Sequence, residues 1–519
     1  MKLVTLFHFH SLLSLFRLLV PLGIAGMLVQ SMKAEEIFIP DPALQRAVAY
    51  SIGVNEKSLT LRLVQEKLEY LEANDRGIRD LRGLEHAYSL KTLVLRDNLI
   101  ENFSPLADLK NLVKLDISGN RLSNLDSLVP LAGTELQNRV NQLKGKMNDS
   151  SLSNEDRTQM TLELSELSRK LKGGRRIIRE LNLAGNRLLG LSGIHHFTSL
   201  VHLDVSENAL LDLEGVGDLK NLVNFFAQGN QLGRPESYTD ENRNKQFDQG
   251  ESFRDISGNG KRDSDPLAEI RDLEKLSNLH LYNNSIKKVD SLSNLPRLNT
   301  LLLSGNQIEQ IRNLGQFDSL RQLSLSNNRL YSLDGVQSLF NLNRLNLAEN
   351  QICDLRPLRN LSQLRAIDLH SNLLINLSDM SLLRNLESVG LSRNFIEDPT
   401  PIFKLPRIKH ISLAFNYLPL ENEVYQETEA LALAKGARLQ VANQQDYLPE
   451  AKELVNCLLG FPDSNRELGN YLRENRYLRL TEFLGSSRYQ EQVKKESLVE
   501  WKEALLKGKP LVQVPFPRG

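Results

Sequence analysis

The fold is decided by residues 320–330, which read LRQLSLSNNRL, and by residues 342–352, which read LNRLNLAENQI. Both follow the pattern L-x-x-L-x-L-x-x-N-x-L and lie 22 residues apart. Asparagine fills the same slot at Asn98, Asn120, Asn186, Asn208, Asn230, Asn284, Asn306, Asn328, Asn350, Asn372, Asn394 and Asn416. A fixed period of this length predicts a stacked solenoid, and it favours a long binding surface over a single catalytic pocket.

The repeating units begin at Leu68, Leu90, Leu112, Ile178, Leu200, Leu222, Leu276, Leu298, Leu320, Leu342, Leu364, Leu386 and Ile408. In an intact unit, apolar residues fill slots 1, 4, 6, 11, 14, 17 and 20. Slots 4 and 6 alternate with polar residues, which predicts a short strand with one buried face. Slots 11, 14, 17 and 20 recur every third residue, which favours a 3₁₀-like or irregular turn. One unit cannot bury its apolar face alone, whereas stacked units form a continuous core.

The asparagine column has a backbone role. The chain must bend after each strand, inside the stack, and there an amide side chain can donate to and accept from otherwise unpaired backbone groups. An aligned column therefore predicts a buried ladder of hydrogen bonds. The first unit has Arg76 in this slot, which an end repeat tolerates because it is partly exposed.

This repeat resembles the 22-residue leucine-rich repeat class, found in internalins and in a eukaryotic protein-phosphatase regulatory subunit. The resemblance covers roughly residues 38–442. Residues 39–44, IPDPAL, resemble the N-terminal cap of secreted bacterial members, and Asp41 and Pro42 suit a helix start. Residues 429–437, EALALAKGA, resemble the closing helix of such arrays, which Gly436 would end.

The expected fold is an α/β solenoid, a right-handed horseshoe of about 13 repeats. Short parallel strands would line the concave face, opposite a 3₁₀ or irregular convex side. A helical hairpin insertion and a helical C-terminal extension would be added. The expected parts are a signal peptide (1–34), an N-terminal helical cap (35–67), repeats 1–3 (68–131), a hairpin insertion (132–177), repeats 4–6 (178–232), a calcium-binding insertion (233–266), the end of repeat 6 with repeats 7–13 (267–418), a C-terminal cap (419–445) and a helical extension with tail (446–519).

Composition and the first residues indicate the compartment. The chain has 64 basic and 64 acidic residues, and without a basic face nucleic acid is not an expected partner. Residues 1–34 combine positive Lys2 and Arg17 with an apolar run at 18–29, which predicts a signal peptide and a secreted, periplasmic or cell-surface protein. The run is short for a membrane span, although an uncleaved anchor remains the alternative. A disulfide between Cys353 and Cys457 stays open.

The first break in the period lies between Leu131 and Ile178. Its apolar residues form two helical stripes, which are Leu136, Val140, Leu143 and Met147, and then Met160, Leu164, Leu167 and Leu171. Ser153 can cap the second helix, with Asp156 three residues later. We expect an antiparallel helical hairpin projecting from the solenoid. It is either a self-contained decoration or a docking arm or dimer contact.

The second break lies between Leu232 and Leu267 and holds two copies of a 15-residue pattern. Counted from the first aspartate of each copy, oxygen-bearing residues fall at the ligand positions of an EF-hand-type loop. The predicted Ca²⁺ ligands are Asp240, Asn242, Asn244, Asp248 and Glu251 in the first copy, and Asp255, Ser257, Asn259 and Asp263 in the second. The segment resembles tandem Asp/Asn-rich calcium repeats of secreted bacterial proteins.

Each copy departs from the calcium pattern. The first has Lys245 at the glycine position, and the second has Pro266 at position 12, so that Asp265 or Glu269 would have to substitute. These departures predict weakened affinity or shared ligands. The alternative is a solvated acidic loop without metal.

The outward slots of the middle repeats predict a partner-binding surface. Slot 7 is mostly small elsewhere, as at Ser304 and Ser326, which we interpret as structural. Against this background the candidate contact residues are His202, Asp204, Phe226, His280, Tyr282 and Leu302. Phe226 follows the core residue Phe225, so we expect it to be exposed, and exposed aromatic residues on a rigid sheet are typical interface anchors. We expect the calcium insertion to adjoin this surface, whose alternative is an ordinary solvated face.

No enzyme motif accompanies the repeats. The histidines at 202, 280, 370 and 410 are spread over the stack, and no G-x-S-x-G, phosphate-binding glycine loop or H-E-x-x-H is present. The sequence therefore predicts a non-catalytic secreted scaffold that binds a protein or a glycan. A calcium-dependent structural or envelope-associated scaffold is the alternative, and a phosphatase-regulator-like role is the third. The oligomeric state is not indicated.

Overall fold

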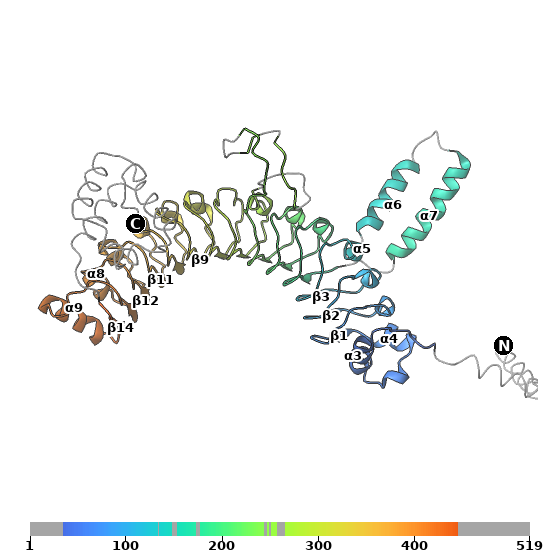
Figure 1. The fold of residues 1–519 in the computed structure, drawn as a ribbon, viewed down its shortest axis with the longest axis horizontal. Helices are drawn as coiled ribbons and strands as arrows, with labels where there is room; N and C mark the ends of the chain where they lie inside the picture. Colours follow the sequence, from blue (N-terminus) through green and yellow to red (C-terminus); the bar gives the residue numbers. More distant parts are fainter. Residues whose placement is uncertain are drawn as a thin grey trace, which may run out of the picture.

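The chain forms a curved solenoid of 14 parallel strands that follow one another in sequence order (Figure 1). The computed structural model describes residues 35–132, 134–147, 153–172, 177–242, 247–248, 251–256 and 265–444. The strands line the inner, concave side of the arch. This arrangement confirms the predicted solenoid. The expected signal peptide and C-terminal extension lie outside the described residues.

Each strand has three residues, and its middle side chain points into the core. The strands are β1 (Tyr70–Glu72), β2 (Thr92–Val94), β3 (Lys114–Asp116), β4 (Glu180–Asn182), β5 (His202–Asp204), β6 (Asn224–Phe226), β7 (Asn278–His280), β8 (Thr300–Leu302), β9 (Gln322–Ser324), β10 (Arg344–Asn346), β11 (Ala366–Asp368), β12 (Ser388–Gly390), β13 (His410–Ser412) and β14 (Arg438–Gln440). Equivalent slots pair across strands, so that Leu323 of β9 faces Leu345 of β10. Fully buried leucines at these positions join one core that runs through the whole array.

The convex side is built mainly from 3₁₀ turns, as the three-residue spacing predicts. They are Leu84–His86, Ser104–Leu106, Ile194–His196, Val216–Asp218, Ala268–Ile270, Arg312–Gln316, Val336–Ser338, Arg356–Leu358 and Ser378–Leu382. Short α-helices replace the turn at α5 (Val129–Ala132) and α8 (Thr400–Phe403). The 3₁₀ form fits because slots 14, 17 and 20 then fall on one buried side.

The asparagine ladder forms as predicted. Asn328 accepts from the amide of Ile308 in the preceding repeat at 2.9 Å. Its amide nitrogen donates to the carbonyls of Leu303, Leu325 and Ser326 at 2.9 to 3.2 Å. Each asparagine thereby satisfies backbone groups of two repeats at once. The slot residue of the first unit, Arg76, is exposed.

Helices cover both ends of the array. At the N-terminal end lie α3 (Pro42–Ile52), a 3₁₀ turn (Glu56–Ser58) and α4 (Leu61–Lys67). Asp41 caps α3 by accepting from the amides of Ala43 and Leu44, as the sequence predicts. At the other end, α9 (Glu423–Ala434) precedes β14, and Gly436 between them has a φ of 78°. The closing helix therefore delivers a further strand that the repeat count did not anticipate.

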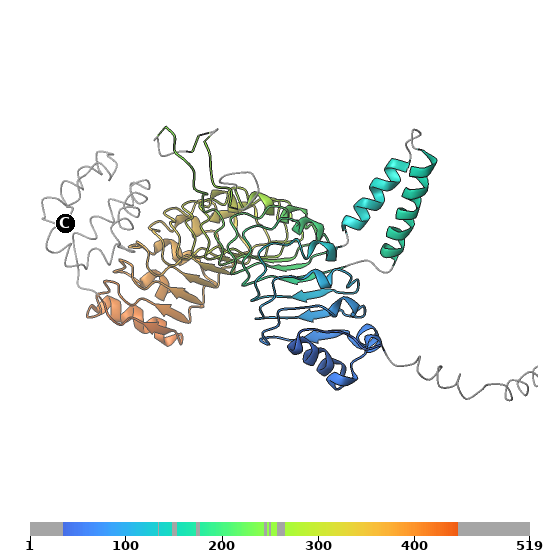
Figure 2. The ribbon, with the colours of Figure 1, turned by 45° about the vertical axis from the view of Figure 1, so that its right-hand side comes forward.

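The first insertion is a helical hairpin that stands apart from the arch (Figures 1 and 2). Helices α6 (Thr134–Met147) and α7 (Asn154–Lys172) pack against each other. Val140 and Leu143 are buried, in agreement with the predicted stripe on α6. The hydroxyl of Ser153 accepts from the amide of Asp156 at 3.1 Å, which is the expected cap.

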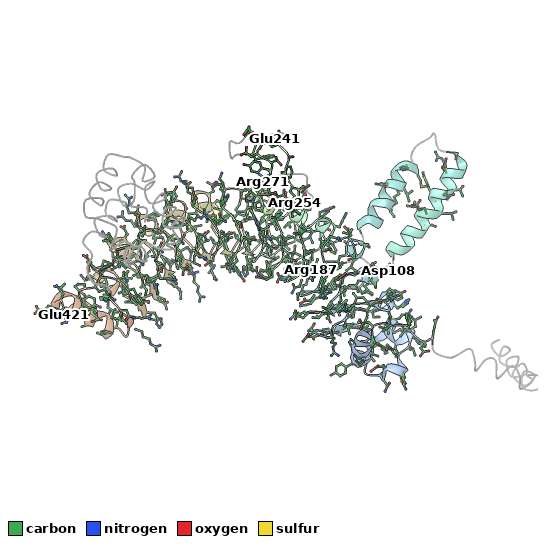
Figure 3. The ribbon with its side chains drawn as sticks, viewed as in Figure 1. Asp108, Arg187, Glu241, Arg254, Arg271 and Glu421 are labelled. Carbon is green, nitrogen blue, oxygen red and sulfur yellow. The ribbon has the colours of Figure 1, made fainter. Side chains whose placement is uncertain are left out.

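The second insertion rises from the convex side, opposite the strands, in both ribbon views. Figure 3 places Glu241 near its outer end. The expectation that it adjoins the partner surface is therefore wrong. The insertion begins after Leu232, which follows the end of β6 by six residues, and it returns at Leu267, directly before the 3₁₀ turn Ala268–Ile270 of the convex side.

Candidate binding face

The predicted partner residues form a row across β5–β8. Asp204, Phe226, His280 and Leu302 occupy the same position on neighbouring strands. The rings of Phe226 and His280 are 4.6 Å apart between centroids, and His280 lies 6.4 Å from the Tyr282 ring. The strand pairing thus brings together residues that the second insertion separates in sequence.

The row is partly covered rather than fully exposed. Phe226, His280, Tyr282 and Leu302 are each half-buried. The ring of Phe226 packs against that of His280 on the neighbouring strand, and His280 also lies against the ring of Tyr282. The predicted exposure of Phe226 is therefore only partly met. Burial lowers the pKa of His280, although the charge of Asp204 acts in the opposite direction. His280 accordingly favours the neutral form, which suits a mainly apolar contact.

A second row beside it is polar and fixed. His202 is exposed, and its Nδ1 lies 2.5 Å from the amide nitrogen of Asn224. Asn224 in turn accepts from Asn278 at 2.5 Å. Since the oxygen of Asn224 is used by Asn278, its nitrogen donates to His202, which leaves the proton of a neutral His202 on Nε2. A neutral His202 therefore offers one hydrogen-bond donor, its Nε2–H group, to solvent.

A groove that the sequence did not reveal lies on the adjoining strands. It is open, has a volume of about 610 Å³, and extends from Leu302 of β8 to Gln440 of β14. Small side chains leave it hollow, among them Ser324, Ala366 and Gly390. At Gly390 a Cβ would collide with the carboxylate of Asp368. The volume depends on neighbouring side chains of several strands, so no single repeat indicates it.

Within this groove, Asp368 is tied to a histidine. Its carboxylate lies 2.9 Å from Nδ1 of His370, whose Nε2 lies 3.5 Å from Glu349. The hydrogen bond with Asp368 raises the pKa of His370. Burial alone would raise the pKa of Asp368, but the hydrogen bonds and charge of His370 outweigh burial and lower it. This acidic residue therefore already has a hydrogen-bond partner within the protein.

The predicted calcium insertion is described only in part. Tyr238 and Phe253 form an antiparallel bridge, and Phe247 packs edge-on against both rings. The bridge places Asp240 and Asp255, the first positions of the two copies, each two residues beyond the same pairing.

Within the first copy, the Glu251 carboxylate accepts from the amides of Glu241 and Asp248, both at 3.0 Å. Asn242 donates to Asp248 at 2.5 Å. Asn244, Ser257, Asn259 and Asp263 lie outside the described residues. Where the chain is described, no group of three His, Cys, Asp or Glu side chains is placed to hold a metal ion. Calcium binding thus stays a prediction.

Comparison with known proteins agrees with the solenoid architecture. A family model described as leucine-rich repeats, two copies, matches residues 88–130. These residues therefore carry leucine-rich repeats. An internalin of Listeria monocytogenes superimposes with a TM-score of 0.52 at 19% identity, over 79% of this chain and 91% of that one. A leucine-rich repeat protein of Leptospira interrogans gives 0.51 at 22% identity, over 76% and 89%. These similarities establish the fold.

A curated protein also matches part of the chain in sequence. It is a homologue of a protein phosphatase 1 regulatory inhibitor subunit from Arabidopsis thaliana, 26% identical over 209 residues. The match spans 40% of this chain and about half, 48%, of the relative.

Across the described ranges, no helix is long and apolar enough to cross a membrane. His202, His280, His370 and His410 stand on or beside four different strands, β5, β7, β11 and β13. Leucine-rich repeat folds generally serve as non-catalytic interaction scaffolds.

Proposed function

We propose that this chain is a secreted, non-catalytic scaffold that binds a protein partner through the concave face of β5–β8. The aromatic row of Phe226, His280 and Tyr282 carries the proposal. Half-buried rings are held rigidly by neighbouring strands, so a partner can cover them with little loss of side-chain entropy. Clustered aromatic residues of this kind are typical anchors of interfaces.

Secretion is supported by the N-terminal sequence. Residues 1–34 have the charged and apolar regions of a signal peptide. Expression of the full chain with a C-terminal tag, followed by N-terminal sequencing of the exported product, tests it. A product that retains residue 1 and stays in the membrane fraction would favour an uncleaved anchor.

The binding test uses a double variant, Phe226→Ala with Tyr282→Ala, in affinity capture from the native milieu. The expected result is loss of the captured protein. The matched control is Tyr70→Ala, since Tyr70 is an exposed aromatic residue of β1 on the same sheet. Undiminished capture by the double variant, or equal loss in the control, would contradict a role of this row.

Calcium is the second part of the proposal. The paired start of the two copies and the acidic side chains of Asp240, Asp248, Glu251 and Asp255 support it, because Ca²⁺ prefers several oxygen ligands from one short loop. Bound Ca²⁺ would rigidify the insertion on the convex side. The same ion could instead make the whole scaffold calcium-dependent and attach it to the cell envelope.

Calorimetry and thermal unfolding with about 1 mM Ca²⁺ test this point, since extracellular calcium modules bind in this range. We expect heat of binding and a raised Tm, both removed by Asp240→Asn with Asp255→Asn. Glu241→Gln is the matched control, because Glu241 lies in the first loop at a position without a ligand role. No heat and no change in Tm would exclude the calcium proposal. Partner capture that survives chelation would separate the first function from the calcium-dependent scaffold.

A phosphatase-regulator-like role is a second candidate, favoured by the similarity to the Arabidopsis thaliana protein. Purified protein phosphatase 1 catalytic subunit supplies the test. Binding or inhibition by the chain without residues 1–34 would support it, and neither effect would leave the secreted scaffold as the better explanation.

A further inference from the structure

Charge is distributed unevenly over the concave face. On the first strands, cations have acidic partners: Lys91 lies 2.7 Å from Glu69, and Lys114 lies 2.8 Å from Glu180. Arg96 lies 2.7 Å from the buried Asp116. Opposite charges on neighbouring strands therefore compensate one another in this region.

The strands that line the groove are different. Arg321, Arg344 and Arg438 are exposed, and among the described residues none of them forms an ion pair. Arg365 and Lys409 share one acid, Glu387, at 3.7 and 2.7 Å. The other acid of the groove floor, Asp368, is bound to His370. The groove is thus left with an excess of positive charge.

These arginines are placed around one continuous surface. Arg344 and Arg438 both line the groove, on β10 and β14. Arg321 precedes β9, and its carbonyl accepts from the amide of Arg344 at 3.0 Å, so the two residues are adjacent. Arg321 and Arg365 also line a polar pocket of about 480 Å³ at the edge of the strands, together with Asn343. The groove and the edge pocket therefore adjoin at Arg321 and Arg344.

The spacing suits an extended chain. Strands β10 and β14 are four strand steps apart, which corresponds to about 19 Å at 4.8 Å per step. An extended polypeptide covers this distance with about six residues. The groove floor between them is made of small or polar side chains such as Ser388 and Gly390, so a main chain can approach closely.

We propose that the groove binds an extended acidic polypeptide segment, whose carboxylates contact Arg321, Arg344 and Arg438. The guanidinium group pairs with a carboxylate through two parallel hydrogen bonds, which favours this partner chemistry. The three arginines lie on or beside β9, β10 and β14, apart from the aromatic rings of β6 and β7, and the groove meets that row at Leu302 of β8. This inference rests on the proposed scaffold function in one respect: if the same partner contacts both surfaces, the groove extends the interface.

The test uses fluorescence anisotropy with the folded chain without residues 1–34 and a labelled twelve-residue peptide rich in glutamate. We expect binding at low ionic strength that weakens with added salt. The same peptide with glutamine in place of glutamate should not bind. Failure of the glutamate peptide to bind the wild-type chain overturns the proposal.

Two charge-matched variants locate the contact. Arg321→Gln, Arg344→Gln and Arg438→Gln together should weaken binding about tenfold, whereas Lys91→Gln, Lys114→Gln and Arg179→Gln remove the same net charge and should change it less than about twofold. Equal weakening by both variants would indicate non-specific attraction and overturn the assignment.

A sulfated heparin oligosaccharide distinguishes another class of ligand. Heparin binding without glutamate-peptide binding would assign the groove to a glycan instead and overturn the proposal. Neither measurement involves the partner captured through Phe226 and Tyr282, so this inference and the proposed function can fail independently.

Discussion

Two regions of the concave face share one framework but differ in how their charges are paired. Beside β2 and β3, Lys91, Arg96 and Lys114 contact acids on the adjacent strand. Beside β9 and β10, Arg321 and Arg344 contact no acid in the described structure. The core slots are equally leucine-rich in both regions. The comparison teaches that outward slots vary independently of the slots that make the fold, so they are where function is to be sought.

The largest expected effect tests whether the asparagine ladder contributes equally to stability in the two regions. Asn120→Ala and Asn394→Ala should each reduce the free energy of unfolding by about 3 kcal/mol, because each strands buried carbonyls and an amide. Both asparagines make the same four kinds of hydrogen bond. Urea unfolding followed by circular dichroism measures the loss. A loss more than about twice as large in one region would show that the two frameworks differ.

A smaller effect should separate the regions. Arg96→Met should cost about 1.5 kcal/mol, since it leaves the nearly buried carboxylate of Asp116 without its cation. The loss stays moderate because Asp116 still accepts from Ser118 at 2.7 Å and from Asn182 at 3.2 Å. Arg344→Met should cost nothing measurable in the same urea experiment. Equal losses would break the contrast between paired and unpaired cations.

The smallest effect concerns pH. The raised pKa of His370 means that its charged contact stabilises the fold below about pH 6.5 and is lost as pH rises through the raised value. The lowered pKa of Asp368 means that its contribution is present above about pH 4 and is lost as pH falls through the lowered value.

His370→Gln should therefore destabilise by about 0.5 kcal/mol near pH 5.5, a small amount because both side chains are more than a third exposed. Thermal unfolding at about pH 5.5 and pH 8 measures the change, with the difference shrinking at the higher pH. His410→Gln is the control, because His410 stands on the same face without such a contact. A larger effect at pH 8 would show that the pair is not ionised as described.

The framework was predictable because every repeat must bury an apolar face and pair its backbone groups in the same way. The leucine spacing and the asparagine at slot 9 bury the apolar face and pair the backbone within each repeat, so the sequence indicates the strands, the 3₁₀ turns and the ladder. The exposure of a surface side chain depends instead on the side chains of neighbouring strands. Slot arithmetic directs Phe226 outward, yet its exposure depends on His280, which follows only after the insertion. The groove is a joint property of β8 to β14, and it was missed for the same reason.

The calcium insertion shows a different limit. Its ligand spacing is legible in sequence, and the pairing of Tyr238 with Phe253 agrees with two equivalent copies. The side of the solenoid from which the insertion projects was not predicted from the sequence, because it depends on the point at which the loop leaves the repeat. Leu232 follows the end of β6 by six residues, and the insertion rises from the convex side (Figure 1).

The asparagine ladder passes both insertions without a break. Leu122 donates to Asn186 at 3.0 Å across the first, and Leu232 donates to Asn284 at 3.1 Å across the second. Distance along the concave face is therefore set by the number of strands and not by the number of residues. Phe226 on β6 and Arg344 on β10 remain four strand steps apart, about 19 Å, whatever is inserted between their repeats. Insertions can be exchanged or lengthened without altering the spacing that a ligand meets.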